Sequence, residues 1–132
     1  GLTDFMRATL KKYHLDGTHL MAEMTESCMD GQPEKLLHFV DACREMGIQI
    51  ALDDFGTEYS SIYVLYSLGL HSLKLDRKIV QDIYHDSRAR LVARDVINLC
   101  RKLCITSVAE GVEYLLNKPL PEKDFREQYI KD

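Results

Sequence analysis

Residues 48–56, Ile48-Gln49-Ile50-Ala51-Leu52-Asp53-Asp54-Phe55-Gly56, decide the fold of this chain. The apolar run 48–52 is short and follows a glycine, as is typical of a strand buried on both faces of a parallel sheet. Two aspartates follow the run directly. Because functional groups gather where parallel strands end, this stretch predicts a functional loop at the carboxyl edge of a sheet.

Further strands and helices alternate on both sides of this stretch. The other predicted strands are 20–24, 72–76 and 106–110. The predicted helices run from an N-cap at Thr3 to near Asp16, from Pro33 to Gly47, from about Ser60 to Gly69, and from about Lys78 to Cys104, where a break near 86–87 would divide the last one. Strands joined by single helices through short connections predict right-handed βαβ units. The fold class is therefore α/β with parallel strands.

The composition is that of one globular domain. The chain has 132 residues, of which 45% are hydrophobic and 29% charged, and its formal net charge is −4. An acidic chain is not expected to bind DNA or RNA, whereas a small phosphate ligand could still bind through metal ions. No apolar stretch approaches the roughly 18 residues of a membrane span, and no leader pattern opens the chain, so we expect a cytoplasmic protein without a membrane segment.

The four cysteines do not form a disulfide framework. Cys28, Cys43, Cys100 and Cys104 lie within or beside apolar helical patterns, so we expect reduced thiols. Cys100 and Cys104 are one helical turn apart and could share a metal, but neither a second close pair nor a nearby histidine completes a zinc site.

Acidic residues recur at the predicted carboxyl edge of the sheet. Glu23, Asp53, Asp54 and Glu110 lie at or just beyond strand ends, as does Asp76. The alternation in 73–75 places Lys74 opposite two leucines, so the lysine can point into a barrel lumen toward these acids. Carboxylates converging around one lysine suit two hard cations and an activated water, and hence phosphate ester hydrolysis. The structural alternative is that the acids cap helices and the lysine neutralises a buried acid.

Five segments, taken in order, resemble the signature segments of the EAL family. These are Glu23-Met24-Thr25-Glu26-Ser27, Ala51-Leu52-Asp53-Asp54-Phe55-Gly56-Thr57, Tyr59-Ser60-Ser61, Leu73-Lys74-Leu75-Asp76-Arg77 and Val108-Ala109-Glu110-Gly111-Val112-Glu113. The resemblance implies a modified (β/α)₈ barrel of TIM type that hydrolyses cyclic di-GMP to pGpG with two Mg²⁺ or Mn²⁺ ions.

The resemblance also implies a role for each matched residue. Glu23, Asp53 and Asp54 match metal ligands of the family, while Lys74 and Glu110 match the residues that hold and polarise the attacking water.

Two further acids match supporting positions of the family. Glu26 matches the acid that orders the loop after the two aspartates, and Glu113 matches a second, supporting acid of the last motif.

The sequence departs from the family pattern in three ways. The opening strands are missing, and with them the glutamate of the Glu-Ala-Leu signature and an asparagine that complete the metal site. A βα unit of about 25 to 30 residues, including a glutamine, is missing between Glu113 and Tyr114. Glu58 stands where the family usually has a glycine.

From these departures we expect one partial EAL-like domain over 1–132, with a deletion junction at 113–121 and a C-terminal helix at 122–130.

Two hypotheses follow for the function. In the first, the chain belongs to a cyclic di-GMP phosphodiesterase whose missing barrel parts come from a larger protein or a second subunit, and the isolated chain is inactive and binds metal weakly or not at all. In the second, it is an inactive remnant that senses the nucleotide or binds a partner protein. Because an open half-barrel leaves two unpaired sheet edges, we also expect a homodimer.

Overall fold

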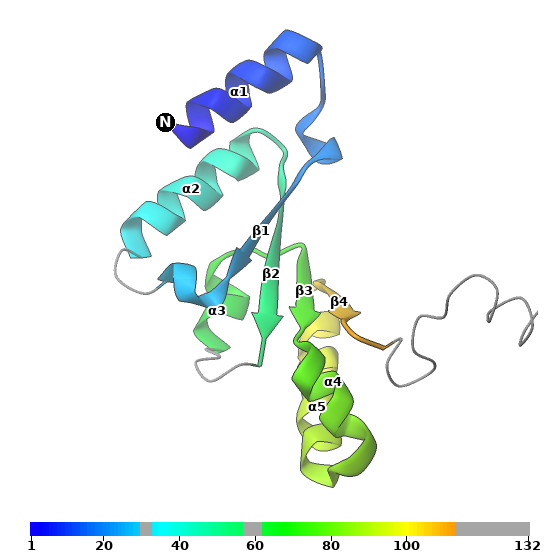
Figure 1. Cartoon of the computed structure of the whole chain (residues 1–132). Coiled ribbons are helices and arrows are strands. Elements are labelled where there is room, and N and C mark those ends of the chain that lie inside the picture. The colour runs from blue at the N-terminus through cyan, green and yellow to red at the C-terminus, as the bar shows by residue number, and fades with distance from the viewer. Residues whose placement is uncertain (30–32, 57–61, 113–132) are drawn as a thin grey trace, which may run out of the picture.

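The computed structural model describes residues 1–29, 33–56 and 62–112 (Figure 1). The predicted junction at 113–121, the helix at 122–130, Glu58 and Glu113 lie outside the described residues. The elements are α1 (Leu2–Tyr13), η1 (Gly17–His19), β1 (Met21–Thr25), η2 (Glu26–Met29), α2 (Pro33–Glu45), β2 (Gln49–Phe55), α3 (Ile62–Ser67), β3 (Ser72–Leu75), α4 (Arg77–His85), α5 (Ser87–Lys102) and β4 (Thr106–Ala109).

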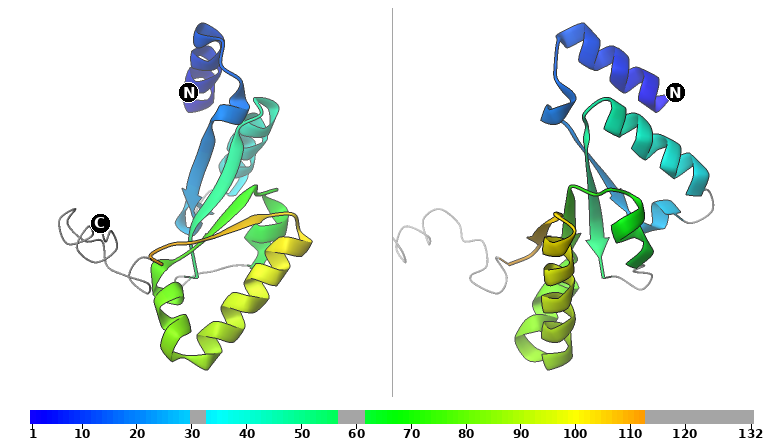
Figure 2. Two further views of the ribbon diagram at one scale, coloured as in Figure 1. Left: turned by 90° about the vertical axis from the view of Figure 1, so that its right-hand side faces the viewer. Right: turned by 180° about the vertical axis from the view of Figure 1, so that it is seen from behind.

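The four strands form one parallel sheet in the order β1-β2-β3-β4. Each strand pairs with the next strand of the chain, and the chain returns between them through helices, as the alternating pattern predicted. Helices α1, α2 and α3 lie to one side of the sheet, while α4 extends beyond the carboxyl end of β3 and α5 returns beside it (Figures 1 and 2). This arrangement confirms an α/β fold.

The core fills the space between one face of the sheet and the helices. Its largest fully buried side chains come from β2 and β3, from the facing helices and from residues next to these elements: Ile48, Ile50, Leu52, Leu73, Leu75, Val40, Cys43, Val64, Leu68, Val80 and Cys100. Alternation along β3 then turns Ser72 and Lys74 to the opposite face. We call that opposite side the luminal face, defined by Met21, Glu23, Gln49, Ser72, Lys74, Thr106 and Val108.

Most element boundaries differ from the predictions by one or two residues, and two of the differences change the interpretation of a residue. Thr3 is not an N-cap, because the Gly1 carbonyl already accepts the amide of Phe5 at 3.1 Å and α1 begins at Leu2. Strand β2 continues to Phe55, three residues beyond the predicted end, and so includes both aspartates.

The break predicted near 86–87 is confirmed. Asp86 separates α4 from α5, and its Oδ1 accepts the amide of Arg88 at 2.7 Å. An aspartate that caps the second helix in this way lets the chain reverse without leaving the first amides of α5 unpaired.

Candidate metal and phosphate site

A bulge in β2 shapes the site. Leu52 pairs with Leu73 and Phe55 with Leu75, so β2 holds one more residue than β3 between the two pairs. Asp54 has a φ of 56°, in the left-handed region that aspartate tolerates better than most residues. In a regular strand Asp53 and Asp54 would face opposite sides of the sheet, but a bulge re-aims a side chain. Both carboxylates therefore reach the luminal side.

Three carboxylates meet at the carboxyl edge. Each of Asp53, Asp54 and Glu110 offers an oxygen, and these oxygens lie within 4.8 Å of one another. In the described part of the chain this is the one group of three or more His, Cys, Asp or Glu side chains close enough to share a metal ion. Oxygen donors in such a group fit hard cations such as Mg²⁺ and Mn²⁺.

Lys74 joins the acids of three strands. Its Nζ lies 2.7 Å from Glu110 Oε1, 3.1 Å from Asp53 Oδ2 and 3.4 Å from Glu23 Oε2. The hydrogen bond to Glu110 contributes most to raising the pKa of Lys74 well above its usual range; burial opposes the shift, and Asp53 adds to it. Lys74 is therefore an ammonium ion throughout the physiological pH range.

The cluster carries excess negative charge. One ammonium faces the carboxylates of Glu23, Asp53, Asp54 and Glu110. Partial desolvation raises the pKa of Asp54, and the negative charges of neighbouring acids, Asp53 first, raise it further. Lys74 offsets only part of this effect. Such a site favours an additional cation.

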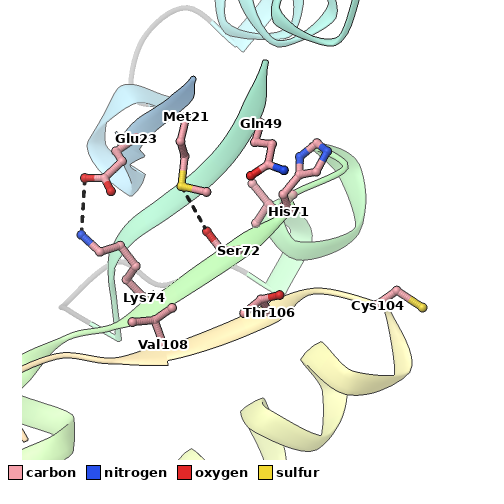
Figure 3. Close-up of a pocket in the computed structure, with 10 residues that line it drawn as sticks. Met21, Glu23, Gln49, His71, Ser72, Lys74, Cys104, Thr106 and Val108 are labelled. Atoms are coloured by element: carbon pink, nitrogen blue, oxygen red, sulfur yellow. Dashed lines mark hydrogen bonds and ion pairs between the residues drawn. The ribbon is translucent and has the colours of Figure 1, made fainter. Parts of the chain in front are cut away.

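A pocket of about 470 Å³ opens on the luminal face beside the acids. Figure 3 shows Glu23 and Lys74 at one end of it, with Met21, Gln49 and Ser72 farther along the strands. The Ser72 hydroxyl lies 3.7 Å from Met21 Sδ. Glu23 and Lys74 thus belong both to the wall of the pocket and to the acidic cluster.

The structure brings the predicted site residues together in a different grouping from the one that the sequence analysis proposed. Asp53 and Asp54 lie with Glu110, whereas Glu23 lies outside that group of three and reaches it through Lys74. Glu26 begins η2 directly after β1. Asp76 has the structural role that we considered as the alternative, because its Oδ1 caps α4 by accepting the amide of Lys78 at 2.8 Å.

All four cysteines are free thiols, with Cys43 and Cys100 buried and the other two exposed. Burial raises the pKa of both buried thiols, which keeps them protonated. None of the described helices is long and apolar enough to cross a membrane.

A sequence model of the EAL domain matches residues 1–114. The chain belongs to the EAL domain family. Among curated relatives, this EAL chain is 37% identical over 113 residues to the bifunctional diguanylate cyclase/cyclic di-GMP phosphodiesterase MucR of Pseudomonas aeruginosa, covering 86% of this chain and 16% of MucR. It is 32% identical over 142 residues to the cyclic di-GMP phosphodiesterase RocR of the same species, covering 94% of this chain and 36% of RocR.

Solved EAL structures share the fold. The PaMucR phosphodiesterase in complex with c-di-GMP superimposes with a TM-score of 0.77 at 32% identity, over 95% of this chain and 58% of that one. The manganese and cyclic di-GMP complex of Klebsiella pneumoniae BlrP1 gives 0.76 at 29% identity, over 83% of this chain and 28% of that one. The described sheet is thus part of a TIM-type EAL barrel, and the chain spans much less than the full length of its relatives.

Proposed function

We propose that this EAL chain contributes part of a site for metal-dependent hydrolysis of cyclic di-GMP to pGpG. The observation that carries the proposal is the convergence of Asp53, Asp54 and Glu110 within 4.8 Å, beside an ammonium group. Related proteins named as cyclic di-GMP phosphodiesterases support the choice of substrate. The convergence of acids alone supports only a cation site.

Mg²⁺ or Mn²⁺ suits the donor set. Asp53, Asp54 and, by resemblance, Glu23 would hold the ions, and their excess negative charge makes cation binding favourable. A bound divalent ion supplies Lewis acidity, which polarises the phosphate and lowers the pKa of a bound water.

Lys74 acts as a donor and not as a base. An ammonium has three N–H donors, and each of them has a carboxylate partner in Glu110, Asp53 or Glu23. To hold a water or a phosphate oxygen, Lys74 must release one partner. The Glu23 contact, at 3.4 Å, is the longest, so we propose that Glu23 turns from Lys74 to a cation when one binds.

Glu110 is the acid that would hold the attacking water and accept its proton. Its hydrogen bond to Lys74 fixes one carboxylate oxygen, Oε1, and leaves Oε2 available for a second contact. Removing this carboxylate should therefore abolish turnover, and it should also weaken metal binding because a Glu110 oxygen lies within 4.8 Å of oxygens of Asp53 and Asp54.

The remaining ligands must come from outside this chain, either from a larger protein or from a second copy. The Glu-Ala-Leu glutamate, an asparagine and a late glutamine of the family have no match in this sequence. The RocR match extends over 142 positions although the chain has 132 residues, so the alignment includes positions that this chain lacks, as a deletion would require.

A partner-binding role is the second candidate function. Met21 and Val108 are 46% and 39% exposed on the luminal face. Strands β1 and β4 have a neighbour on one side only within the described sheet. Apolar side chains beside open strand edges favour association with another chain, such as a second copy.

Titration calorimetry with Mn²⁺ tests the proposal. We expect weak binding by the chain, lost in the double variant Asp53→Asn/Asp54→Asn. The matched control is Asp82→Asn/Asp95→Asn, which removes the same charge from exposed positions of α4 and α5. Equal binding by the two double variants would show that the two aspartates do not hold the metal.

A further inference from the structure

The start of α4 lies between the two segments that carry the acids. Helix α4 follows the central strand β3, with β2 on one side and β4 on the other. The amide of Asp76 donates to Phe55 O at 3.0 Å, and the amide of Glu110 donates to Leu75 O at 3.3 Å. The backbone at the junction of β3 and α4 thus holds the ends of both neighbouring strands.

Side chains of the first turn of α4 cover the glycines that follow the acids. Gly56 has a φ of 105°, and a Cβ at this position would overlap Ile79 Cδ1 and lie 3.0 Å from Ile79 Cγ1. Gly111 has a φ of 73°, and a Cβ there would lie 2.6 Å from Arg77 Cγ. Both glycines therefore allow α4 to pack directly on their backbones.

Ile79 makes this contact instead of joining the main core. It is half-buried and absent from the core cluster and from the side chains packed against it in the described part of the chain, whereas the next residue, Val80, is 2% exposed and belongs to the cluster. Truncating Ile79 should therefore cost little global stability. Its main effect should be on the segment that follows Asp54.

We propose that Ile79 is a positioning residue for the acidic cluster, which it orders by packing on Gly56, two residues beyond Asp54. The proposal rests on the proposed function in one respect, namely that the cluster holds a metal. Without Ile79 the backbone at 54–56 gains freedom, and the Asp54 carboxylate spends less time beside Asp53 and Glu110. Residues that orient metal ligands typically change metal affinity by about 10- to 100-fold when removed.

The test compares Ile79→Ala with Ile83→Ala. Ile83 lies one turn farther along α4, is half-buried and is likewise outside the core cluster of the described residues. Both variants thus remove the same side-chain groups from the same helix. Ile79→Ala removes them near the site, and Ile83→Ala removes them one turn away. We expect Ile79→Ala to weaken Mn²⁺ binding about tenfold, Ile79→Leu to restore most of it, and Ile83→Ala to leave it unchanged.

Amide hydrogen exchange without metal provides a second readout. We expect Ile79→Ala to speed exchange of the Asp76 amide, which bonds to Phe55, and not of the Gln49 amide, which bonds to Leu20 at the opposite end of the sheet. Equal effects of both alanine variants, or no effect of Ile79→Ala, would overturn the positioning role. If the unmodified chain binds no Mn²⁺, the metal proposal fails, and exchange at Asp76 decides the positioning role alone.

Discussion

Lys74 Nζ and Glu110 Oε1 lie 2.7 Å apart, on β3 and just beyond the end of β4. The side chain of Lys74 is 19% exposed and that of Glu110 35%, so water screens their attraction only in part. The same ammonium contacts Asp53 and Glu23, which lie on β2 and β1. One charge on the central strand therefore holds together acids from the three other strands.

Replacing Lys74 by methionine should destabilise the chain by about 1–2 kcal/mol at pH 7, because several carboxylates lose their shared counter-charge. Since folding raises the pKa of Lys74, its stabilising effect is complete below the unfolded pKa of about 10.4 and is lost as pH rises toward the higher folded value. Urea unfolding should show a constant difference between pH 7 and pH 9 that shrinks only above about 10.4. Lys78→Met, at an exposed position of α4, is the control and should unfold with the same free energy as the unmodified chain. An equal loss of unfolding free energy in Lys74→Met and Lys78→Met would contradict this prediction.

The left-handed conformation of Asp54 predicts a contrast between two uncharged replacements. Asparagine tolerates a φ of 56°, whereas valine, which is branched at Cβ, does not. We expect Asp54→Val to be less stable than Asp54→Asn by about 1–2 kcal/mol in urea unfolding.

Asp54→Asn should itself be as stable as the unmodified chain or slightly more stable at pH 7 without metal. The pKa of Asp54 is raised in the folded state, so its ionised form weakens folding as pH rises, and the amide removes that effect. A valine variant as stable as the asparagine variant would mean that the bulge does not require this conformation.

The sequence predicted the elements well because their signals are local. Short runs between the helical patterns located all four strands, and alternation along 73–75 predicted the side of the sheet that Lys74 faces. The bulge at Asp54 could not be predicted, since it depends on the register between β2 and β3. The grouping of Glu110 with Asp53 also depends on how β4 lies beside β3. The prediction of Thr3 as an N-cap was wrong because a side chain that can cap a helix does not prevent the helix from beginning at an earlier residue.

The open luminal face predicts self-association. Light scattering during gel filtration should give a mass near twice the 15.2 kDa of the chain. Met21→Lys/Val108→Lys places charges on the exposed apolar side chains of that face and should shift the mass toward a monomer. Leu91→Lys/Val92→Lys, on an exposed part of α5, provides a control with the same added charge. A monomer at micromolar concentration in the unmodified chain would exclude this association.

The isolated chain should not convert cyclic di-GMP to pGpG at a useful rate, although Lys74 and Glu110 are both present. Hydrolysis between two cations requires both ions to be held about 4 Å apart with the phosphate between them, and the family ligands absent from this sequence would fix that spacing. A displacement of about 1 Å can cost on the order of a hundredfold in rate. Incubation with Mn²⁺ and cyclic di-GMP, followed by chromatography, measures the pGpG that is formed.

Adding the missing barrel segment of a related EAL domain should raise turnover, and Glu110→Gln should abolish the gain. Turnover by the chain alone at rates typical of enzymes, lost in Glu110→Gln, would mean that the acids on these four strands suffice for the chemistry.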